Sequence, residues 1–117
     1  MTILTLTTQA ANSRYDYLNK KAFARAARSF LRDVAKRLTL PKGSFDIRYN
    51  EGGIAGSGDA ILHGESFYVH LNDFGCYWRK CKGRKDYCGE YNRWPHPELA
   101  AKDLAAEIGV AIGVKTI

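Results

Sequence analysis

Residues 59–82 read DAILHGESFYVHLNDFGCYWRKCK, and this stretch decides the fold. Apolar and aromatic residues flank Gly64 and Glu65, which together fit a two-residue type II′ turn. The pattern predicts a β-hairpin over 59–72, with alternate side chains on opposite faces. The resulting register pairs Asp59 with His70, Ala60 with Val69, Ile61 with Tyr68 and Leu62 with Phe67, and places the Ala60 and Leu62 pairs toward the core.

Downstream of the hairpin, turn and loop signals set the next boundaries. Residues 72–75 (Asn-Asp-Phe-Gly) are typical of a turn, so we predict a further antiparallel strand over 76–82. Residues 83–96 contain two glycines and a proline and are predicted as loop. The last helix is predicted to begin at Pro97, because proline suits the first helical position.

Upstream, residues 15–38 show the periodicity of a long amphipathic helix, which ends before Pro41 and Gly43. Apolar residues recur at every fourth position, and further ones widen the same stripe toward the core. The stripe comprises Leu18, Ala22, Ala26, Phe30, Val34 and Leu38, widened by Phe23, Ala27 and Leu31.

The remaining segments complete a prediction of fold class. Residues 2–7 are rich in threonine and are predicted as a short strand, and residues 45–49 alternate like a half-buried strand. The glycine-rich segment 50–58 lacks the lysine and the following helix of a P-loop, so a flexible loop is favoured over an anion nest. We predict a single α+β domain over 1–117, with an antiparallel sheet of about four strands. A long N-terminal helix and a C-terminal helix pack on this sheet, in the order β-α-β-β-β-α.

Composition narrows the class of protein. A chain of 117 residues with 45% hydrophobic residues suits one globular domain. No apolar run approaches the roughly 20 residues that span a bilayer, so no membrane partner is expected. The first residues lack the basic and apolar regions of a signal peptide. With three cysteines and no such signal, we expect reduced thiols and a cytoplasmic location.

Residues 76–94 form the main candidate binding segment. They hold both tryptophans and six of the Lys and Arg residues of a chain whose net charge is +6. Cations interleaved with aromatic rings suit phosphates, stacked bases or an acidic protein surface. The candidate binding residues are Tyr77, Arg79, Lys80, Lys82, Arg84, Lys85, Tyr87, Tyr91, Arg93 and Trp94. Alternatively, Tyr77, Trp78 and Trp94 complete the core, and the cations surround them.

A second candidate surface lies on the helix predicted at 15–38. Five cations fall within an arc of about 80° opposite the apolar stripe and extend roughly 22 Å along the helix. They are Lys21, Arg25, Arg28, Arg32 and Lys36, and no acidic residue interrupts the arc. The alternative is a solvated face of good helix formers with no ligand.

Metal binding and catalysis are the chemical alternatives. Cys76, Cys81, Cys88 and His96 would supply a known structural zinc set, but the intervening gaps of four, six and seven residues do not match its usual spacing. An Asp59–His70 pair would orient an imidazole as general base, with Cys76 as the nearest nucleophile. The same pair also suits an ordinary polar surface. Because no catalytic motif accompanies these residues, we expect no cofactor and no enzymatic activity.

Residues 58–94 resemble small accessory proteins carried by bacterial phages and plasmids. The likeness rests on the alternating strand pair at 58–71, on YWRKCKGRKDYCG at 77–89 and on Asn92, Arg93 and Trp94. It covers about a third of the chain and carries no catalytic signature. The resemblance implies a mobile-element protein, many of which are anti-CRISPR-like inhibitors of host defence.

From the resemblance and the residues together, we expect a non-enzymatic, stoichiometric inhibitor in the cytoplasm of a bacterial host. Its partner would be a host defence protein or ribonucleoprotein complex. The alternative is a nucleic-acid-binding accessory or regulatory protein that contacts DNA or RNA directly. Because no helix-turn-helix is apparent, that alternative favours recognition of shape or of single strands. A small Cys- or His-dependent enzyme is the third possibility.

Overall fold

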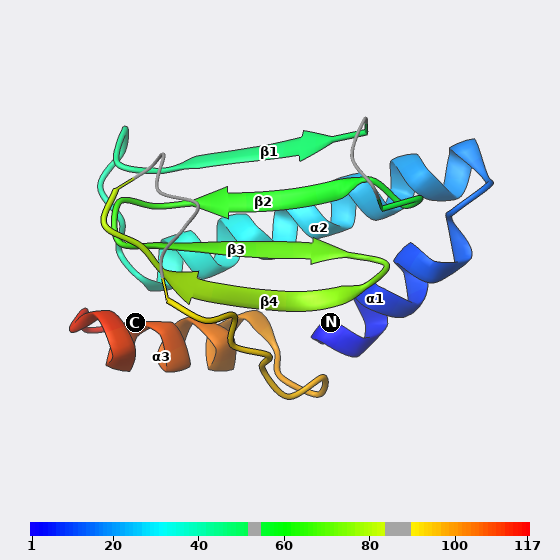
Figure 1. Ribbon diagram of the computed structural model, residues 1–117. Helices are drawn as coiled ribbons and strands as arrows, with labels where there is room; N and C mark the ends of the chain where they lie inside the picture. Colours follow the sequence, from blue (N-terminus) through cyan, green and yellow to red (C-terminus); the bar gives the residue numbers. More distant parts are fainter. Residues whose placement is uncertain (52–54, 84–89) are drawn as a thin grey trace.

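In the described part of the chain, four strands form one antiparallel sheet (Figure 1). Their order across the sheet is the same as their order in the sequence. The computed structural model describes residues 1–51, 55–83 and 90–117. Its elements are α1 (Ile3–Asn12), α2 (Tyr17–Arg37), β1 (Asp46–Asn50), β2 (Asp59–His63), β3 (Phe67–Asn72), β4 (Gly75–Lys80) and α3 (Ala101–Ile112). The predicted α+β class, four-stranded antiparallel sheet, long N-terminal helix and C-terminal helix are confirmed.

Helices cover only one face of the sheet in the described part of the chain. α1 and α2 pack against the strands, and α3 lies beside α2 next to β4 (Figure 1). The core between these layers holds fully buried side chains from the helices and from alternate strand positions. The largest are Trp78, Phe23, Phe67, Leu6, Leu31, Leu38, Leu62, Leu71, Leu104 and Ile108. The intervening strand positions therefore place Asp59, His70 and Tyr77 on the opposite face.

The β2–β3 hairpin has a register two residues away from the predicted one. Leu62 lies opposite Val69, because the Gly64 N–H donates to the Phe67 carbonyl (2.9 Å) and the turn therefore falls one residue later. A Cβ at Gly64 would lie 2.7 Å from the Phe67 ring, so this glycine makes room for the ring beside the turn. The predicted faces remain correct, because a shift of two residues preserves the alternation.

The predicted strand at 2–7 is wrong, because these residues form the first turns of α1. The Thr2 side chain caps this helix by accepting a hydrogen bond from the Thr5 N–H (3.2 Å). Ile3, Leu6 and Ala10 are buried at helical spacing. Burying this apolar face outweighs the strand preference of the threonines, which is a weak and context-dependent term.

The predicted long helix is confirmed as α2, but its apolar stripe is wrong at one end. Asp16 caps the helix by accepting hydrogen bonds from the N–H groups of Leu18 and Asn19. Leu18 is 75% exposed, whereas Leu38 at the other end is fully buried. Leu18 and Lys36 are eighteen residues apart, which is five full helical turns, so Leu18 points with the exposed Lys36 away from the buried face of α2.

The last helix begins at Ala101 and not at Pro97, as predicted. The backbone of the preceding segment bonds instead to the start of α1. The Leu4 N–H donates to the Pro97 carbonyl (2.7 Å) and the Ile3 N–H donates to the Leu99 carbonyl (2.9 Å). These carbonyls thus join the segment before α3 to the start of α1, and α3 begins four residues later than predicted. The predicted loops at 50–58 and 83–96 include residues 52–54 and 84–89, which lie outside the described residues.

Candidate functional site

Residues 91–94 lie along the edge of β4, where two backbone hydrogen bonds hold them. The Trp78 N–H donates to the Arg93 carbonyl (3.0 Å), and the Arg93 N–H donates to the Trp78 carbonyl (2.7 Å). This antiparallel bridge brings Tyr91 and Trp94 next to β4, although both follow it in the sequence by more than ten residues. The bridge therefore assembles the two ends of the predicted binding segment at one place.

Ring contacts cross the face of the sheet that the helices leave uncovered. His70 stacks on Tyr77 with centroids 4.9 Å apart and an interplanar angle of 10°. Tyr68 meets His70 edge-on at 5.0 Å, and Tyr77 contacts the tilted Trp94 ring at 5.0 Å. We call Tyr68, His70, Tyr77 and Trp94 the aromatic row. Because each ring contacts the next, the exposed end is held in a defined orientation.

The aromatic row runs from a buried end to an exposed end. Tyr68 is 3% exposed and Trp94 is 60% exposed, with the half-buried Tyr77 between them. Trp78 points to the other face of β4 and is fully buried. The alternative prediction, that these aromatic residues complete the core, is therefore correct for Trp78. It is not correct for Trp94, because much of that ring is accessible to solvent. Tyr91 is also exposed, at 72%.

A carboxylate fixes the middle of the aromatic row. His70 Nδ1 lies 2.9 Å from Asp59 Oδ2, and the Asn72 side-chain amide donates to Asp59 Oδ1 (3.1 Å). The predicted Asp59–His70 pair therefore forms, although the two residues are diagonal neighbours in the observed register. Burial, and then the nearby Asp59 charge, raises the pKa of Tyr77, so its phenol stays neutral at neutral pH.

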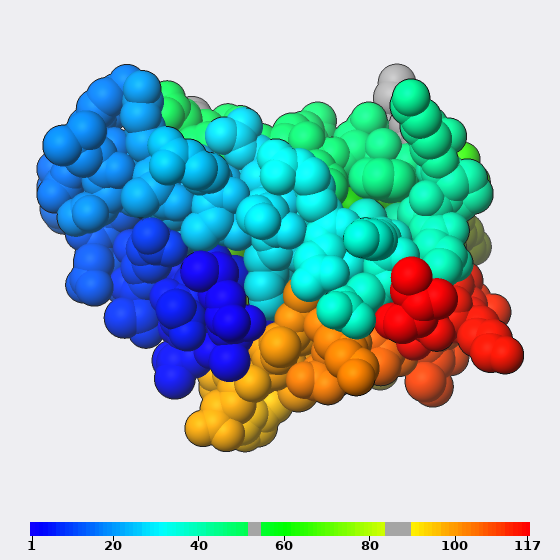
Figure 2. Space-filling model, turned by 180° about the vertical axis from the view of Figure 1, so that it is seen from behind, coloured from blue at the N-terminus to red at the C-terminus, as the bar shows by residue number. Residues whose placement is uncertain are grey.

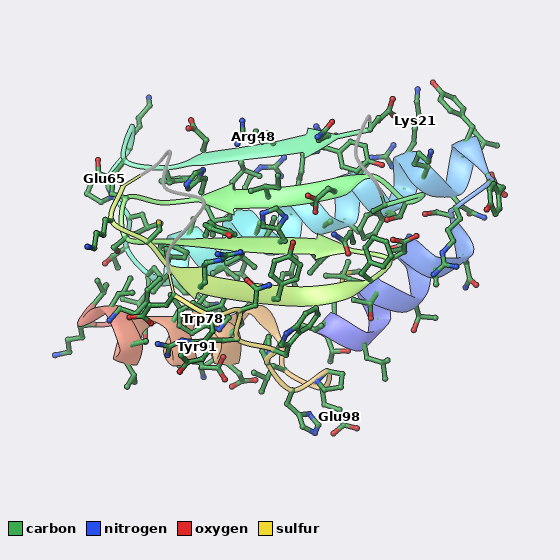
Figure 3. The ribbon with its side chains drawn as sticks, in the orientation of Figure 1. Lys21, Arg48, Glu65, Trp78, Tyr91 and Glu98 are labelled. Atoms are coloured by element: carbon green, nitrogen blue, oxygen red, sulfur yellow. The ribbon has the colours of Figure 1, made fainter. Side chains whose placement is uncertain are left out.

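The predicted cations of this segment have different surroundings. The Arg79 guanidinium lies 5.0 Å above the Tyr68 ring, at the buried end of the aromatic row. Arg93 lies 4.8 Å from the Trp78 ring and 5.4 Å from the Tyr91 ring, and its charge is paired with Glu90 (3.1 Å). Both rings, which are labelled near each other in Figure 3, therefore contact the Arg93 guanidinium.

Lys80 is half-buried and Lys82 is exposed just after β4. Arg84, Lys85 and Tyr87, which the sequence also predicts as binding residues, lie outside the described residues. The described site therefore consists of the aromatic row, Tyr91 and the four cations Arg79, Lys80, Lys82 and Arg93.

The five cations predicted on the long helix all lie on α2, away from its buried face. Lys21, Arg25, Arg32 and Lys36 are exposed, and Arg28 is half-buried. Two of them have contacts within the helix. Lys21 Nζ lies 4.8 Å above the Tyr17 ring, and Arg28 Nε donates to the Ala24 carbonyl (3.3 Å). We call these five residues the α2 stripe.

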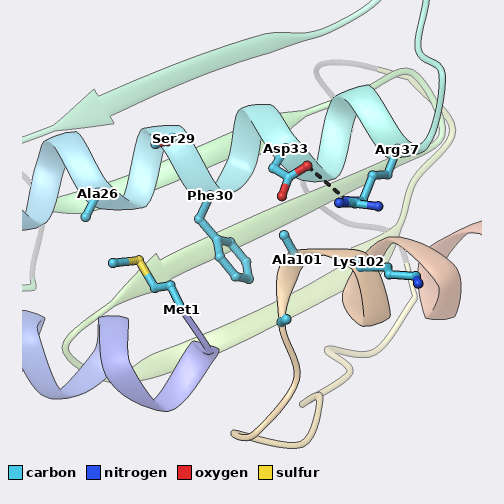
Figure 4. A pocket seen from close by; sticks show the side chains of 9 residues that line it. Met1, Ala26, Ser29, Phe30, Asp33, Arg37, Ala101 and Lys102 are labelled. Carbon is cyan, nitrogen blue, oxygen red and sulfur yellow. Dashed lines mark hydrogen bonds and ion pairs between the residues drawn. The ribbon is translucent and has the colours of Figure 1, made fainter. Parts of the chain in front are cut away.

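A cavity of about 320 Å³ opens between the start of α1, α2 and the start of α3 (Figure 4). Phe30 and Met1 line its apolar side, and Lys102 lines its edge. Asp33 and Arg37 form an ion pair (3.0 Å) at the same cavity, so these two charges satisfy each other. The predicted candidate residues lie elsewhere, and the sequence gives no signal for this cavity.

The thiols and His96 do not come together in the described part of the chain. Cys76 and Cys81 are buried, and Cys88 lies outside the described residues. His96 is exposed and its Nδ1 accepts a hydrogen bond from the Glu98 N–H (3.2 Å). Among described residues, no group of three His, Cys, Asp or Glu side chains is placed to hold a metal ion.

Cys76 lies on the core side of β4, where burial raises the pKa of its thiol from 9.0 to about 12. The neutral thiol is therefore favoured in the folded protein, and its contribution to stability is present below about pH 9 and is lost toward about pH 12. From about pH 8 to about pH 11, this residue alone should lower the free energy of unfolding by about 2–3 kcal/mol. Urea denaturation of the wild type and of Cys76→Ala at both pH values measures this contribution. Equal pH dependence in the two proteins would contradict the prediction.

Two contributors to this region carry only weak sequence signals. Phe74 is 63% exposed at the β3–β4 turn, and a Cβ at the adjacent Gly75 would lie 3.2 Å from the Trp94 ring. The sequence indicates Phe74 only weakly, as an aromatic residue within the predicted turn at 72–75. Glu107 of α3 accepts a hydrogen bond from the Trp78 indole N–H (2.8 Å), and nothing in the sequence pairs these two residues.

Comparison of the chain with protein-family models, with curated proteins and with solved structures found no match. In the described part of the chain, every helix is too short or too polar to cross a bilayer. The candidate site is therefore interpreted from its own geometry.

Proposed function

We propose that this protein is a non-enzymatic binding protein whose ligand is single-stranded nucleic acid, held at the exposed end of the aromatic row. The observation that carries the proposal is the contact of Trp94 with Tyr77 on a sheet face without a helix, with 60% of Trp94 exposed. Bases stack on such rings with little dependence on sequence.

The arrangement of charge supports the same ligand. Arg79 follows Tyr77 on the same face of β4, about 7 Å along the strand. A single strand with a base stacked on Trp94 would thus extend its backbone toward Arg79, while Lys80 lies on the other face of β4 and the exposed Lys82 follows the strand. The protein as a whole has a net charge of +6, which favours binding of a polyanion such as nucleic acid.

Tryptophan fluorescence tests the proposal directly, because only one of the two tryptophans is accessible. Trp78 is fully buried and Trp94 is 60% exposed. We expect oligo-deoxythymidine to quench the emission of the wild type, since a stacked base contacts Trp94. In Trp94→Phe, binding measured by anisotropy should persist while the quenching disappears. Absence of both binding and quenching at low salt would contradict the proposal.

The second candidate function is that of an inhibitor that binds another protein. The exposure of neighbouring aromatic rings favours it. Phe74, Tyr91 and Trp94 are each at least 60% exposed near β4, and Trp, Tyr and Arg concentrate at interface hot spots. A target in host defence rests on the resemblance to phage and plasmid proteins alone. A pull-down from bacterial lysate separates the two candidates. A partner retained after nuclease treatment and lost in Trp94→Ala favours the inhibitor.

A further inference from the structure

The α2 stripe is a straight row of charge on the side of the molecule opposite the aromatic row. α2 lies across the face seen from behind, where its outer surface is open (Figure 2). The buried residues of α2, such as Phe23, Leu31 and Val34, lie on the side of the helix that packs against the sheet, α1 and α3. The cations fall within an arc of about 80° on the outer side and span roughly 22 Å.

Within the described part of the chain, three of the five cations of the α2 stripe lack an ion-pair partner, while Lys21 interacts electrostatically with Glu51. No acidic side chain there forms an ion pair with Arg25, Arg32 or Lys36. The acid inside α2, Asp33, pairs instead with Arg37 at the cavity next to α3. Like charges at neighbouring helical positions repel each other. Five cations at one-turn spacing therefore gain free energy when an external anion approaches them.

We propose that the α2 stripe binds the phosphate backbone of duplex nucleic acid. A rigid helix holds the five cations in one line, which suits the regular charge of a duplex. Apart from Tyr17 and Leu18, which are exposed in its first turn, the large apolar residues of α2 are buried in the core, so the helix has no continuous apolar face to insert into a membrane. Among the described residues, the Tyr17 ring contacts the stripe at Lys21, and no ring contact is found at Arg25, Arg32 or Lys36, in contrast to the aromatic row.

This inference does not rest on the proposed function, because the two surfaces lie on opposite sides of the molecule. A molecule bound to a duplex through the α2 stripe keeps Trp94 accessible to a single strand. Contacts of Lys and Arg with phosphates position a protein without reading bases. Duplex binding should therefore depend on salt and not on sequence.

A salt titration with a mixed-sequence DNA duplex of about 16 base pairs, longer than the stripe at 3.4 Å per base pair, tests the proposal. If each of the five cations neutralises one phosphate, affinity should fall about 500-fold between 50 mM and 200 mM salt. The double variant Arg25→Ala/Arg32→Ala should bind more weakly and lose only about 40-fold over the same range. Alanine retains helix propensity at both positions, and a thermal melt checks the fold.

The matched control is Lys102→Ala/Lys115→Ala, which removes the same charge from exposed positions on α3 and the C-terminal tail. Unchanged duplex affinity in this control supports the proposal. Equal loss in both double variants would overturn it, because general charge would then explain the binding. Stripe-dependent binding to phosphatidylserine vesicles, without duplex binding, would also overturn it. Quenching of Trp94 by oligo-deoxythymidine in Arg25→Ala/Arg32→Ala reports separately on the proposed function.

Discussion

Replacing Trp78 by alanine should lower the free energy of unfolding by about 3–5 kcal/mol, the usual cost of truncating a large buried aromatic side chain. Trp78 is fully buried in the core. Its indole N–H donates to Glu107 Oε2 (2.8 Å), and the Arg93 guanidinium lies 4.8 Å from its ring. The single side chain therefore joins β4, α3 and the segment that carries Trp94. A loss of this size is a large part of the 5–15 kcal/mol that stabilises a typical domain.

Urea denaturation followed by circular dichroism measures this loss, and Trp94→Ala is the matched control. The control removes the same side chain from a position that is 60% exposed, so it should cost less than about 1 kcal/mol. Trp78→Phe should fall between the two, because it keeps most of the apolar volume and loses the hydrogen bond to Glu107. Similar losses in Trp78→Ala and Trp94→Ala would show that Trp78 does not anchor the core.

The central elements of the fold could be predicted because their signals are local. The alternation in 59–72 indicates a hairpin, and the apolar period of 15–38 indicates a long helix. The register could not be predicted, because two turns one residue apart fit the same dipeptide pattern. The choice depends on the space that Gly64 leaves for the Phe67 ring, which is a tertiary contact. The strand predicted at 2–7 failed for the same reason, since burial of Leu6 outweighs a propensity.

The candidate site was predictable as a segment but not as a surface. Composition indicated a basic and aromatic stretch, yet it could not separate the buried Trp78 from the exposed Trp94. That difference arises from the Trp78–Arg93 bridge, which joins residues fifteen positions apart. The contact of Trp94 with Tyr77 likewise depends on this bridge. The α2 stripe was predicted fully, because helical geometry alone places its five residues on one side.

Removing the exposed Trp94 ring together with the half-buried Tyr77 ring should weaken single-strand binding by about 30-fold or more. Each base stacked on an aromatic side chain contributes about 1–3 kcal/mol, and 1.4 kcal/mol corresponds to about tenfold in affinity. The variant Tyr77→Ala/Trp94→Ala removes the two rings that contact each other at 5.0 Å. Anisotropy with labelled oligo-deoxythymidine measures the loss. Tyr15→Ala is the control, because Tyr15 is fully exposed between α1 and α2 and takes no part in the ring contacts of the aromatic row.

The single variants Tyr77→Ala and Trp94→Ala show how much each ring contributes to the affinity for a single strand. Tyr77 stacks on His70, which Asp59 holds, so Tyr77 fixes the orientation in which Trp94 meets a base. If Trp94 needs this support, Tyr77→Ala should lose much of the affinity that Trp94→Ala loses. The double variant should then lose less than the product of the two single losses, as expected for coupled neighbours. Independent losses that multiply would mean that each ring stacks its own base. Unchanged affinity in the double variant would remove the aromatic row from the binding site.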